Sequence, residues 1–232
     1  MFDPEHVHAI LFDLDGTLAD TDDTYVRRFA AVLRPFLSII RNQNEMVYAR
    51  RIIMAAESPI NFLLGTLDRL SLDEWIRPLS SGLHHLRGEA RIDDARLIPG
   101  IADALTRLAS RYPLALVTAR EKHSTDTLLH TLQIQSGFQS IATAGTCKRA
   151  KPHPAPVLWT AEQFGLSPKN CLVVGDTPVD IRAGRAAGAQ TIGVLCGFGE
   201  REELLRAGAN LILDSTADLP AVLLEKGNYV QA

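Results

Sequence analysis

The sequence is poor in cysteine and contains no long apolar run. Its three cysteines, Cys147, Cys171 and Cys196, stand far apart along the chain. An odd number at such wide spacing excludes a disulfide framework and a zinc knuckle. No stretch reaches the roughly 18 consecutive apolar residues that a membrane helix needs. We therefore expect no membrane partner and a reducing surrounding.

Basic residues are also scarce where a targeting or nucleic-acid-binding protein would have them. The formal net charge is −3, so no general positive field predicts a nucleic-acid partner. The N-terminal segment, residues 1–8, holds no lysine or arginine and is not typical of a signal peptide. The first lysine is Lys122, so all positive side chains before it are arginines. These features predict a cytoplasmic protein.

What the chain does have is an alternation of short apolar runs with amphipathic stretches. Its length of 232 residues, with 46% hydrophobic and 22% charged residues, is ordinary for a globular protein. Such alternation predicts βαβ units, and hence an α/β fold with a Rossmann-like parallel sheet and helices on both faces. The expected strands are 7–12, 114–117, 141–144, 171–174, 191–194 and 211–213, and the expected helices are 101–111, 122–134, 155–164, 180–187, 201–207 and 217–225.

One segment interrupts this rhythm. Between about residues 20 and 96 no convincing strand is found, whereas Phe29, Leu33 and Leu37 recur at helical spacing. We expect an inserted, all-helical cap domain at 20–96 and a catalytic core formed by residues 1–19 and 97–232. The turn Ile98-Pro99-Gly100 marks the return to the core.

The strongest chemical signal follows the first predicted strand. Asp13 and Asp15 stand two residues apart, and Gly16 permits a sharp turn directly after them. In open parallel sheets, ligands bind at the carboxyl ends of the strands, where these two acids would lie. A turn or a helix cap is the alternative for a single Asp-Gly pair, but the apolar strand before the whole motif favours a site.

A second strand also ends in acids. Asp176 follows the run 171–174, and Asp180 comes four residues later, where it is either a helix cap or a site residue. Several carboxylates at one sheet edge repel one another unless a cation lies among them. Few oxygen ligands, with room for water and phosphate, are typical of Mg²⁺.

Two further residues have the right chemistry for binding phosphate. Thr118 ends the second predicted core strand, where its hydroxyl can donate to a phosphate oxygen and the next amides are expected to begin a helix. Lys151 stands in a loop with prolines, Pro152 and Pro154, that fix its path. Alone, each would be interpreted as structural or solvent-exposed. Beside several acidic strand ends, Lys151 is the expected counter-charge.

In this order, the four elements resemble the haloacid dehalogenase superfamily of phosphohydrolases. The resemblance rests on 13-DLDGT-17, the hydroxyl of Thr118, the Lys151-Pro152 pair and 175-GDTPVD-180, and it covers nearly the whole chain. The helical insertion is similar to a subfamily I cap. The segment 197–209 is similar to phosphoglycolate-phosphatase-like members.

The resemblance implies a role for each motif residue. Asp13 would attack phosphorus and form an aspartyl-phosphate, and Asp15 would act as general acid and base. Mg²⁺ would be held by the carboxylates of Asp13 and Asp176 and the main-chain carbonyl of Asp15, with Asp180 in or near the site. The phosphoryl oxygens would be bound by Thr118 and Lys151.

Four residues beside the motifs are expected to contact substrate: Gly16, Thr17, Ala119 and Arg120. Many relatives carry asparagine after the hydroxyl residue of the second motif, where this chain has Ala119. Arg120 has two interpretations. It either binds an anionic group of the substrate, since guanidinium matches carboxylates and phosphates, or lies on the surface of the next helix.

Together these features predict a Mg²⁺-dependent phosphatase that hydrolyses a small phosphorylated metabolite of the phosphoglycolate type. The absence of lysine before Lys122 argues against Schiff-base chemistry in the cap, and the presence of Asp15 argues against dehalogenation. A phosphomutase of the β-phosphoglucomutase type, a pyrophosphatase or nucleotidase, and a non-catalytic phosphometabolite-binding protein remain alternatives. The sequence does not predict the exact substrate or the oligomeric state.

Overall fold

A computed structural model describes residues 2–20 and 95–225 of the chain. The chain divides into two compact units, one formed by Met1–Asp20 and Ile92–Ala232 and the other by Thr21–Arg91. The predicted cap, 20–96, lies almost wholly outside the described residues, so its helices and the domain limits stay predictions.

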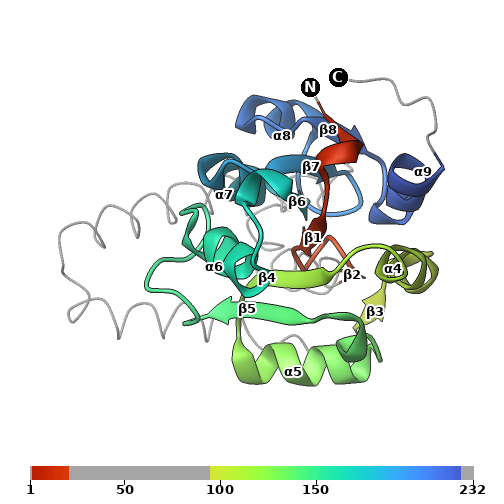
Figure 1. Ribbon diagram of the computed structural model, residues 1–232. Helices are drawn as coiled ribbons and strands as arrows, with labels where there is room; N and C mark the ends of the chain where they lie inside the picture. Colours follow the sequence, from red (N-terminus) through yellow and green to blue (C-terminus); the bar gives the residue numbers. More distant parts are fainter. Residues whose placement is uncertain (1, 21–94, 226–232) are drawn as a thin grey trace, which may run out of the picture. The chain divides into compact units, whose positions relative to one another are not determined.

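The described core is built on a six-stranded sheet in which every neighbouring pair of strands is parallel (Figure 1). The strand order is β5-β4-β1-β6-β7-β8, so β1 lies between β4 and β6. This arrangement confirms the predicted Rossmann-like parallel sheet. The strands are β1 Ala9–Phe12, β4 Leu114–Glu121, β5 Ser140–Ala144, β6 Cys171–Gly175, β7 Gln190–Val194 and β8 Leu211–Leu213.

Helices cover both faces of the sheet, as predicted. Apolar side chains of α4, α5 and α9 form one core cluster with the sheet. Those of α6 and α7 form a second cluster with it. A small third cluster joins α7, α8 and β8. The helices are α4 Ile101–Ala109, α5 Lys122–Thr131, α6 Ala155–Gln163, α7 Pro178–Ala187, α8 Arg201–Ala207 and α9 Leu219–Leu224, with short 3-10 turns η1 Pro4–His6, η3 Gln135–Gly137, η4 Pro168–Asn170 and η5 Thr216–Asp218.

The first two of these clusters follow from the period of a strand. Successive side chains of a strand point to opposite faces, so Ile10 and Phe12 join the first cluster while Ala9 and Leu11 join the second. All four are fully buried. Strands that are buried on both faces appear as continuous apolar runs rather than alternating ones, which is why the sequence pattern located them.

The structure differs in places from the predicted elements. β4 continues past its predicted end at residue 117 to Glu121, so the amides directly after Thr118 belong to a strand and not to a helix N-terminus, whereas α5 begins at Lys122, as predicted. A two-stranded antiparallel ribbon, β2 Ala19–Asp20 with β3 Arg96–Leu97, was not predicted. Strands of two residues are too short to leave any periodic signal in a sequence. No helix among the described residues is long and apolar enough to cross a membrane.

Candidate active site

The sheet order brings three of the four predicted motifs to one edge. Asp13 follows β1, Thr118 lies near the end of β4, and Asp176 follows β6. These strands are adjacent and parallel, so their carboxyl ends meet at the same edge. The amide of Asp13 donates to the carbonyl of Val174 at 2.9 Å, which fixes the ends of β1 and β6 beside each other.

Lys151 supplies the fourth motif and links two of the acids. Its Nζ donates to Asp13 Oδ1 at 2.7 Å, to Asp180 Oδ1 at 2.5 Å and to the carbonyl of Val117 at 2.7 Å. The three side chains are 6%, 12% and 3% exposed for Lys151, Asp13 and Asp180. The structure therefore places the predicted counter-charge among the acids, with a partner for each of its three hydrogens.

Burial and the neighbouring charges together shift the pKa values of this cluster. Burial raises the pKa of Asp13 from 3.8 to about 7; Lys151 opposes this rise, and the charges of Asp180 and Asp15 add to it. Burial lowers the pKa of Lys151, but the nearby charges and hydrogen bonds of Asp13 and Asp180 outweigh it and raise the pKa above its usual value. Lys151 is thus a fixed cation, whereas Asp13 needs a further positive charge to be fully ionised near neutral pH.

Asp176 is completely buried and held from two directions. Thr17 Oγ1 donates to its Oδ1 at 3.1 Å, and the amide of Phe198 donates to its Oδ2 at 2.8 Å. The loop passes so close that a Cβ added to Gly197 would lie against Asp176 Oδ2 and 2.5 Å from the carbonyl oxygen of Gly16. The segment 197–199 was predicted only as a point of family resemblance, and its contact with Asp176 was missed.

Asp180 takes part in the cap of its own helix and in the acidic cluster. It is the third residue of α7, and its Oδ2 accepts hydrogen bonds from the amide and the hydroxyl of Thr177 in a capping box. Its Oδ1 accepts from Lys151. A Cβ on Gly175 would collide with the Cβ of Asp180. Asp180 is therefore part of the helix cap, as one interpretation of the sequence had it, and it also contacts Lys151; its role as a site residue stays a prediction.

The carboxylates form a group suited to a metal ion. One oxygen each of Asp13, Asp176 and Asp180 lies within 4.8 Å of the others. Hard oxygen donors in this number match Mg²⁺, which keeps several waters and is held by few carboxylates. Three acids beside a single lysine also leave negative charge for a cation to balance. The donor set therefore fits a divalent metal.

Asp15 points to a different partner. Both of its oxygens accept from Arg120, with Nε to Oδ2 at 2.6 Å and Nη2 to Oδ1 at 2.7 Å. Arg120 Nη1 donates to Ser124 Oγ at 3.0 Å, and its amide donates to Thr118 Oγ1 at 3.1 Å. Arg120 lies on β4. The interpretation that placed it on the surface of the next helix is therefore wrong about its element. Neither the pair with Asp15 nor the contact with Ser124 was predicted.

The other expected substrate residues have mixed surroundings. Gly16 has φ +73°, the left-handed region that favours glycine. Ala119 is exposed, whereas Thr17 is completely buried and directs its hydroxyl to Asp176. Thr118 is nearly buried; its oxygen accepts from the amide of Arg120, so its hydroxyl hydrogen points elsewhere. Contacts of these residues with substrate, and the main-chain ligand at Asp15, stay predictions.

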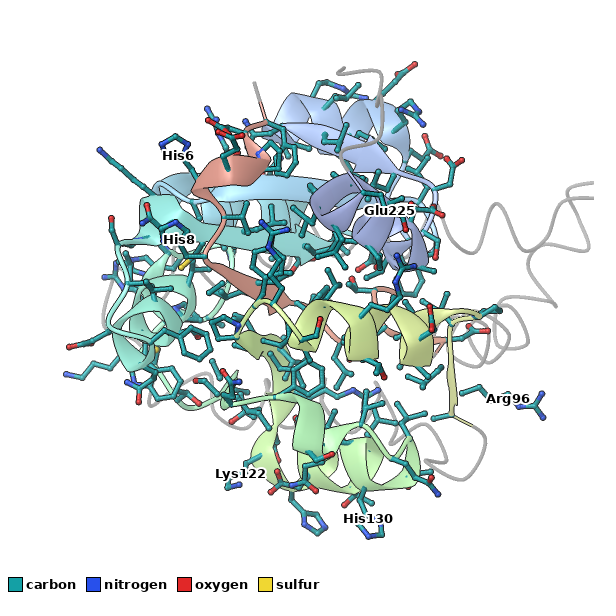
Figure 2. The ribbon with its side chains drawn as sticks, turned by 45° about the vertical axis from the view of Figure 1, so that its right-hand side comes forward. His6, His8, Arg96, Lys122, His130 and Glu225 are labelled. Carbon is teal, nitrogen blue, oxygen red and sulfur yellow. The ribbon has the colours of Figure 1, made fainter. Side chains whose placement is uncertain are left out.

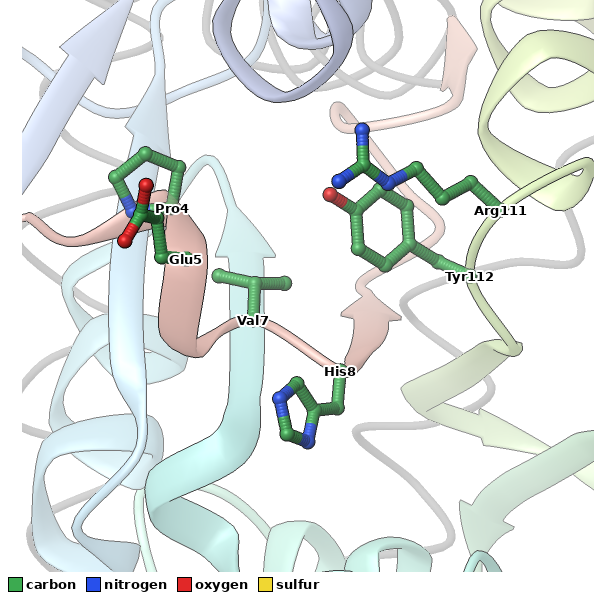
Figure 3. Close-up of a pocket in the computed structure, with 6 residues that line it drawn as sticks. All are labelled: Pro4, Glu5, Val7, His8, Arg111 and Tyr112. Carbon is green, nitrogen blue, oxygen red and sulfur yellow. The ribbon is translucent and has the colours of Figure 1, made fainter.

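The opposite end of the sheet has a hollow that the sequence did not predict. It is lined by residues just before β1 and β4, among them Val7, His8, Arg111 and Tyr112 (Figure 3). These positions precede the strands, so the hollow lies at the amino edge, away from the acids. His6, His8 and His130 lie at the surface (Figure 2), as expected for histidines outside the site.

Comparison with known proteins agrees with this geometry. The family model of haloacid dehalogenase-like hydrolases matches residues 10–194. The pyrophosphatase PpaX of Anoxybacillus flavithermus is 28% identical over 219 residues, which cover 94% of this chain and 97% of that protein. A phosphoglycolate phosphatase of Escherichia coli O157:H7 is 28% identical over 231 residues, covering 93% and 92%.

The fold is also similar to solved structures. A haloacid dehalogenase-like family hydrolase from Streptococcus pneumoniae superposes with a TM-score of 0.70 at 24% identity, and the match covers 94% of this chain and 99% of that one. The family model spans most of the sheet and all four motifs at its carboxyl edge. The chain therefore belongs to the haloacid dehalogenase-like hydrolases, and it is an enzyme of that family.

Proposed function

We propose that this enzyme is a Mg²⁺-dependent phosphatase that hydrolyses a small phosphate monoester of the phosphoglycolate type through an aspartyl-phosphate on Asp13. The observation that carries the proposal is the cluster at the sheet edge. Lys151 donates to both Asp13 and Asp180, and one oxygen of Asp176 lies within 4.8 Å of an oxygen of each of these acids, close enough for one metal ion to contact all three. A nucleophilic carboxylate, a buried cation and a metal-ligand set then meet at one point.

The proposed mechanism assigns one step to each motif residue. Asp13 Oδ attacks phosphorus, and Lys151 together with the hydroxyl of Thr118 binds the phosphoryl oxygens as charge develops on them. Asp15 gives a proton to the leaving oxygen and then takes one from the water that hydrolyses the acyl phosphate. The chemistry is mainly positioning and charge neutralisation, which fits a site built from rigid strand ends.

The carboxylates of Asp13, Asp176 and Asp180 would hold the metal, together with the main-chain carbonyl of Asp15 that the family resemblance implies. When bound, Mg²⁺ supplies positive charge that keeps Asp13 ionised and neutralises the phosphoryl group. This fits the raised pKa of Asp13, about 7, which burial causes when only Lys151 opposes it. Asp176 enters with both oxygens already held by Thr17 and Phe198, so its orientation is set before a metal binds.

Pyrophosphate hydrolysis is the second candidate, because one of the similar curated proteins is a pyrophosphatase. The core residues are compatible with both substrates, since each reaction transfers a phosphoryl group to water. A phosphomutase would differ only in the acceptor of the phosphoryl group. A cytoplasmic location, a small phosphate ester as substrate, and the lack of nucleic-acid and membrane partners are proposed on the sequence alone, and the oligomeric state, monomer or homodimer, is left open.

The deciding experiment measures phosphate release from a panel of monoesters, including phosphoglycolate, and from pyrophosphate. We expect release with Mg²⁺, none with EDTA, and a loss of about 10³-fold or more in Asp13→Asn. Asp103→Asn is the matched control, because Asp103 is 76% exposed on α4. Undiminished release by Asp13→Asn would contradict the mechanism. Binding of a phosphate ester without turnover would favour the non-catalytic alternative.

A further inference from the structure

The ion pair between Arg120 and Asp15 is the most specific contact at the sheet edge that the proposed mechanism leaves unused. Both oxygens of Asp15 are engaged by parallel N–H groups, at 2.6 and 2.7 Å. The side chains are 20% and 31% exposed, so the pair is largely withdrawn from water. Two parallel hydrogen bonds fix the plane of a carboxylate as well as its position.

Arg120 is itself held at two further points. Its Nη1 donates to Ser124 on α5, and its amide donates to Thr118 on the same strand. The guanidinium is planar, so a third donor among its five N–H groups, used on Ser124, fixes its own orientation. Residues of β4 and α5 therefore hold Arg120 in place, and Arg120 in turn holds Asp15, which lies in the turn after β1.

The pair is not needed to hold its two strands together. The backbones of β1 and β4 are already joined as parallel neighbours at Ile10–Leu114, Leu11–Ala115 and Phe12–Leu116. What the two-point contact adds is a fixed position and plane for the Asp15 carboxyl group, to which the proposed function assigns proton transfer.

We propose that Arg120 is a positioning residue that orients the Asp15 carboxyl group for proton transfer at the leaving oxygen and at the attacking water. The inference rests on the proposed function, in which Asp15 is the general acid and base. It adds to the two interpretations that the sequence offered for Arg120, a binder of a substrate anion and a residue on the surface of the next helix; contact of Arg120 with substrate stays a prediction. Lysine, a single point charge, would not reproduce the two-point contact.

The test uses the dependence of the first chemical step on the leaving group. An alkyl phosphate needs a proton on its leaving oxygen, whereas p-nitrophenyl phosphate releases a stable anion without one. We expect Arg120→Gln to slow first-turnover release from an alkyl phosphate by about 10²-fold, the loss that a misplacement of about 1 Å causes. The nitrophenolate burst should keep its wild-type rate, and the slow turnover that follows should report the impaired base step.

Asp15→Asn serves as the reference for this pattern. The double variant Asp15→Asn/Arg120→Gln should be no slower on the alkyl phosphate than Asp15→Asn alone, because Arg120 acts through Asp15. Arg120→Lys should recover only part of the loss. Arg111→Gln, an exposed arginine at the opposite edge of the sheet, should behave as wild type. Thermal unfolding of each variant shows that it is folded.

Three results would overturn the inference. Arg120→Gln could slow both substrates equally, it could multiply the loss of Asp15→Asn in the double variant, or it could accelerate the alkyl phosphate, which would make the pair a restraint on Asp15. Each of these leaves the proposed function intact if Asp15→Asn shows the leaving-group pattern. If Asp15→Asn lacks that pattern, the role of Asp15 in the proposed function is wrong. The behaviour of Asp15→Asn therefore distinguishes a failure of the proposed function from a failure of the inference about Arg120.

Discussion

At the scale of single residues, the site depends on positions where no side chain is allowed. Gly197 passes so close to Asp176 that a Cβ would meet a carboxylate oxygen and the backbone carbonyl of Gly16. Neither group can move easily, because Asp176 is held by Thr17 and Phe198 and the Gly16 carbonyl belongs to the turn after Asp15. The glycine therefore allows the amide of Phe198 in this loop to donate to the carboxylate of Asp176, a proposed metal ligand.

Substituting this glycine should damage the metal site more than the fold. In Gly197→Ala the loop must shift away, which costs about 1–3 kcal/mol of stability as for other overpacked sites. The Phe198 amide then leaves Asp176, so we expect a weaker response of the melting temperature to Mg²⁺. The control is Gly137→Ala, because a Cβ there meets nothing within 4 Å. An unchanged Mg²⁺ response in Gly197→Ala would show that the loop does not orient Asp176.

At the scale of elements, α7 begins with residues that serve the site. Thr177 and Asp180 form the capping box of this helix, and Asp180 also accepts from Lys151. A second capping box, formed by Ser215 and Asp218 at η5, has the same chemistry, and no hydrogen bond between these two side chains and the acidic cluster is found among the described residues. Its neighbour Thr216 donates to the carbonyl of Thr17 at 2.8 Å and is left unchanged in the comparison below. A comparison of variants in the two boxes can therefore distinguish the effect of a cap on stability from its effect on catalysis.

Removal of each cap should have the same kind of structural cost but a different functional one. We expect Thr177→Ala and Ser215→Ala each to lower the free energy of unfolding by about 1 kcal/mol. Only Thr177→Ala should also reduce phosphate release, because Asp180 loses a donor at 2.6 Å and its contact with Lys151 is no longer fixed. Denaturant unfolding and phosphate release measure the two effects. Equal activities of the two variants would argue against this coupling.

At the scale of the whole molecule, the acidic cluster links stability to pH and metal. Asp13 has a pKa of about 7 in the folded chain and an ordinary value of 3.8, chiefly because it is buried. A raised pKa stabilises the folded state fully below the unfolded value, and this contribution is lost as pH rises through the folded value. Metal binding opposes this loss, because it needs the ionised carboxylate.

The metal-free protein should therefore lose stability as the pH rises from about 4 to about 7, the range between the unfolded and the folded pKa of Asp13, and Asp13→Asn should remove the part of this loss that Asp13 causes. Added Mg²⁺ should stabilise the protein more at the higher pH than at the lower one. At a Mg²⁺ concentration of 100 times the Kd, the free energy of unfolding should rise by about 2.7 kcal/mol. Thermal unfolding with Mg²⁺ or EDTA at each pH measures this. A greater stabilisation by Mg²⁺ at the lower pH would contradict the assignment of Asp13 as a ligand.

The local pattern of the sequence was sufficient for the sheet and for the motif residues at its edge. Continuous apolar runs such as 171–174 located the strands, because a strand buried on both faces leaves no polar positions. Acids directly after such runs, as at Asp13 and Asp176, had to meet at one edge once the strands were parallel. The two-residue strands of the β2–β3 ribbon left no such pattern and were missed.

Only the tertiary structure decided which side chains these residues contact. The pair of Asp15 with Arg120 joins positions 105 residues apart, and the bond of Thr17 to Asp176 joins positions 159 apart. Contacts of this kind depend on strand order, on the path of loops such as 197–199 and on which donors remain after the backbone is paired. The spacing of apolar residues in the sequence indicates whether a residue is buried or exposed, whereas the partner of its side chain depends on how the whole sheet packs.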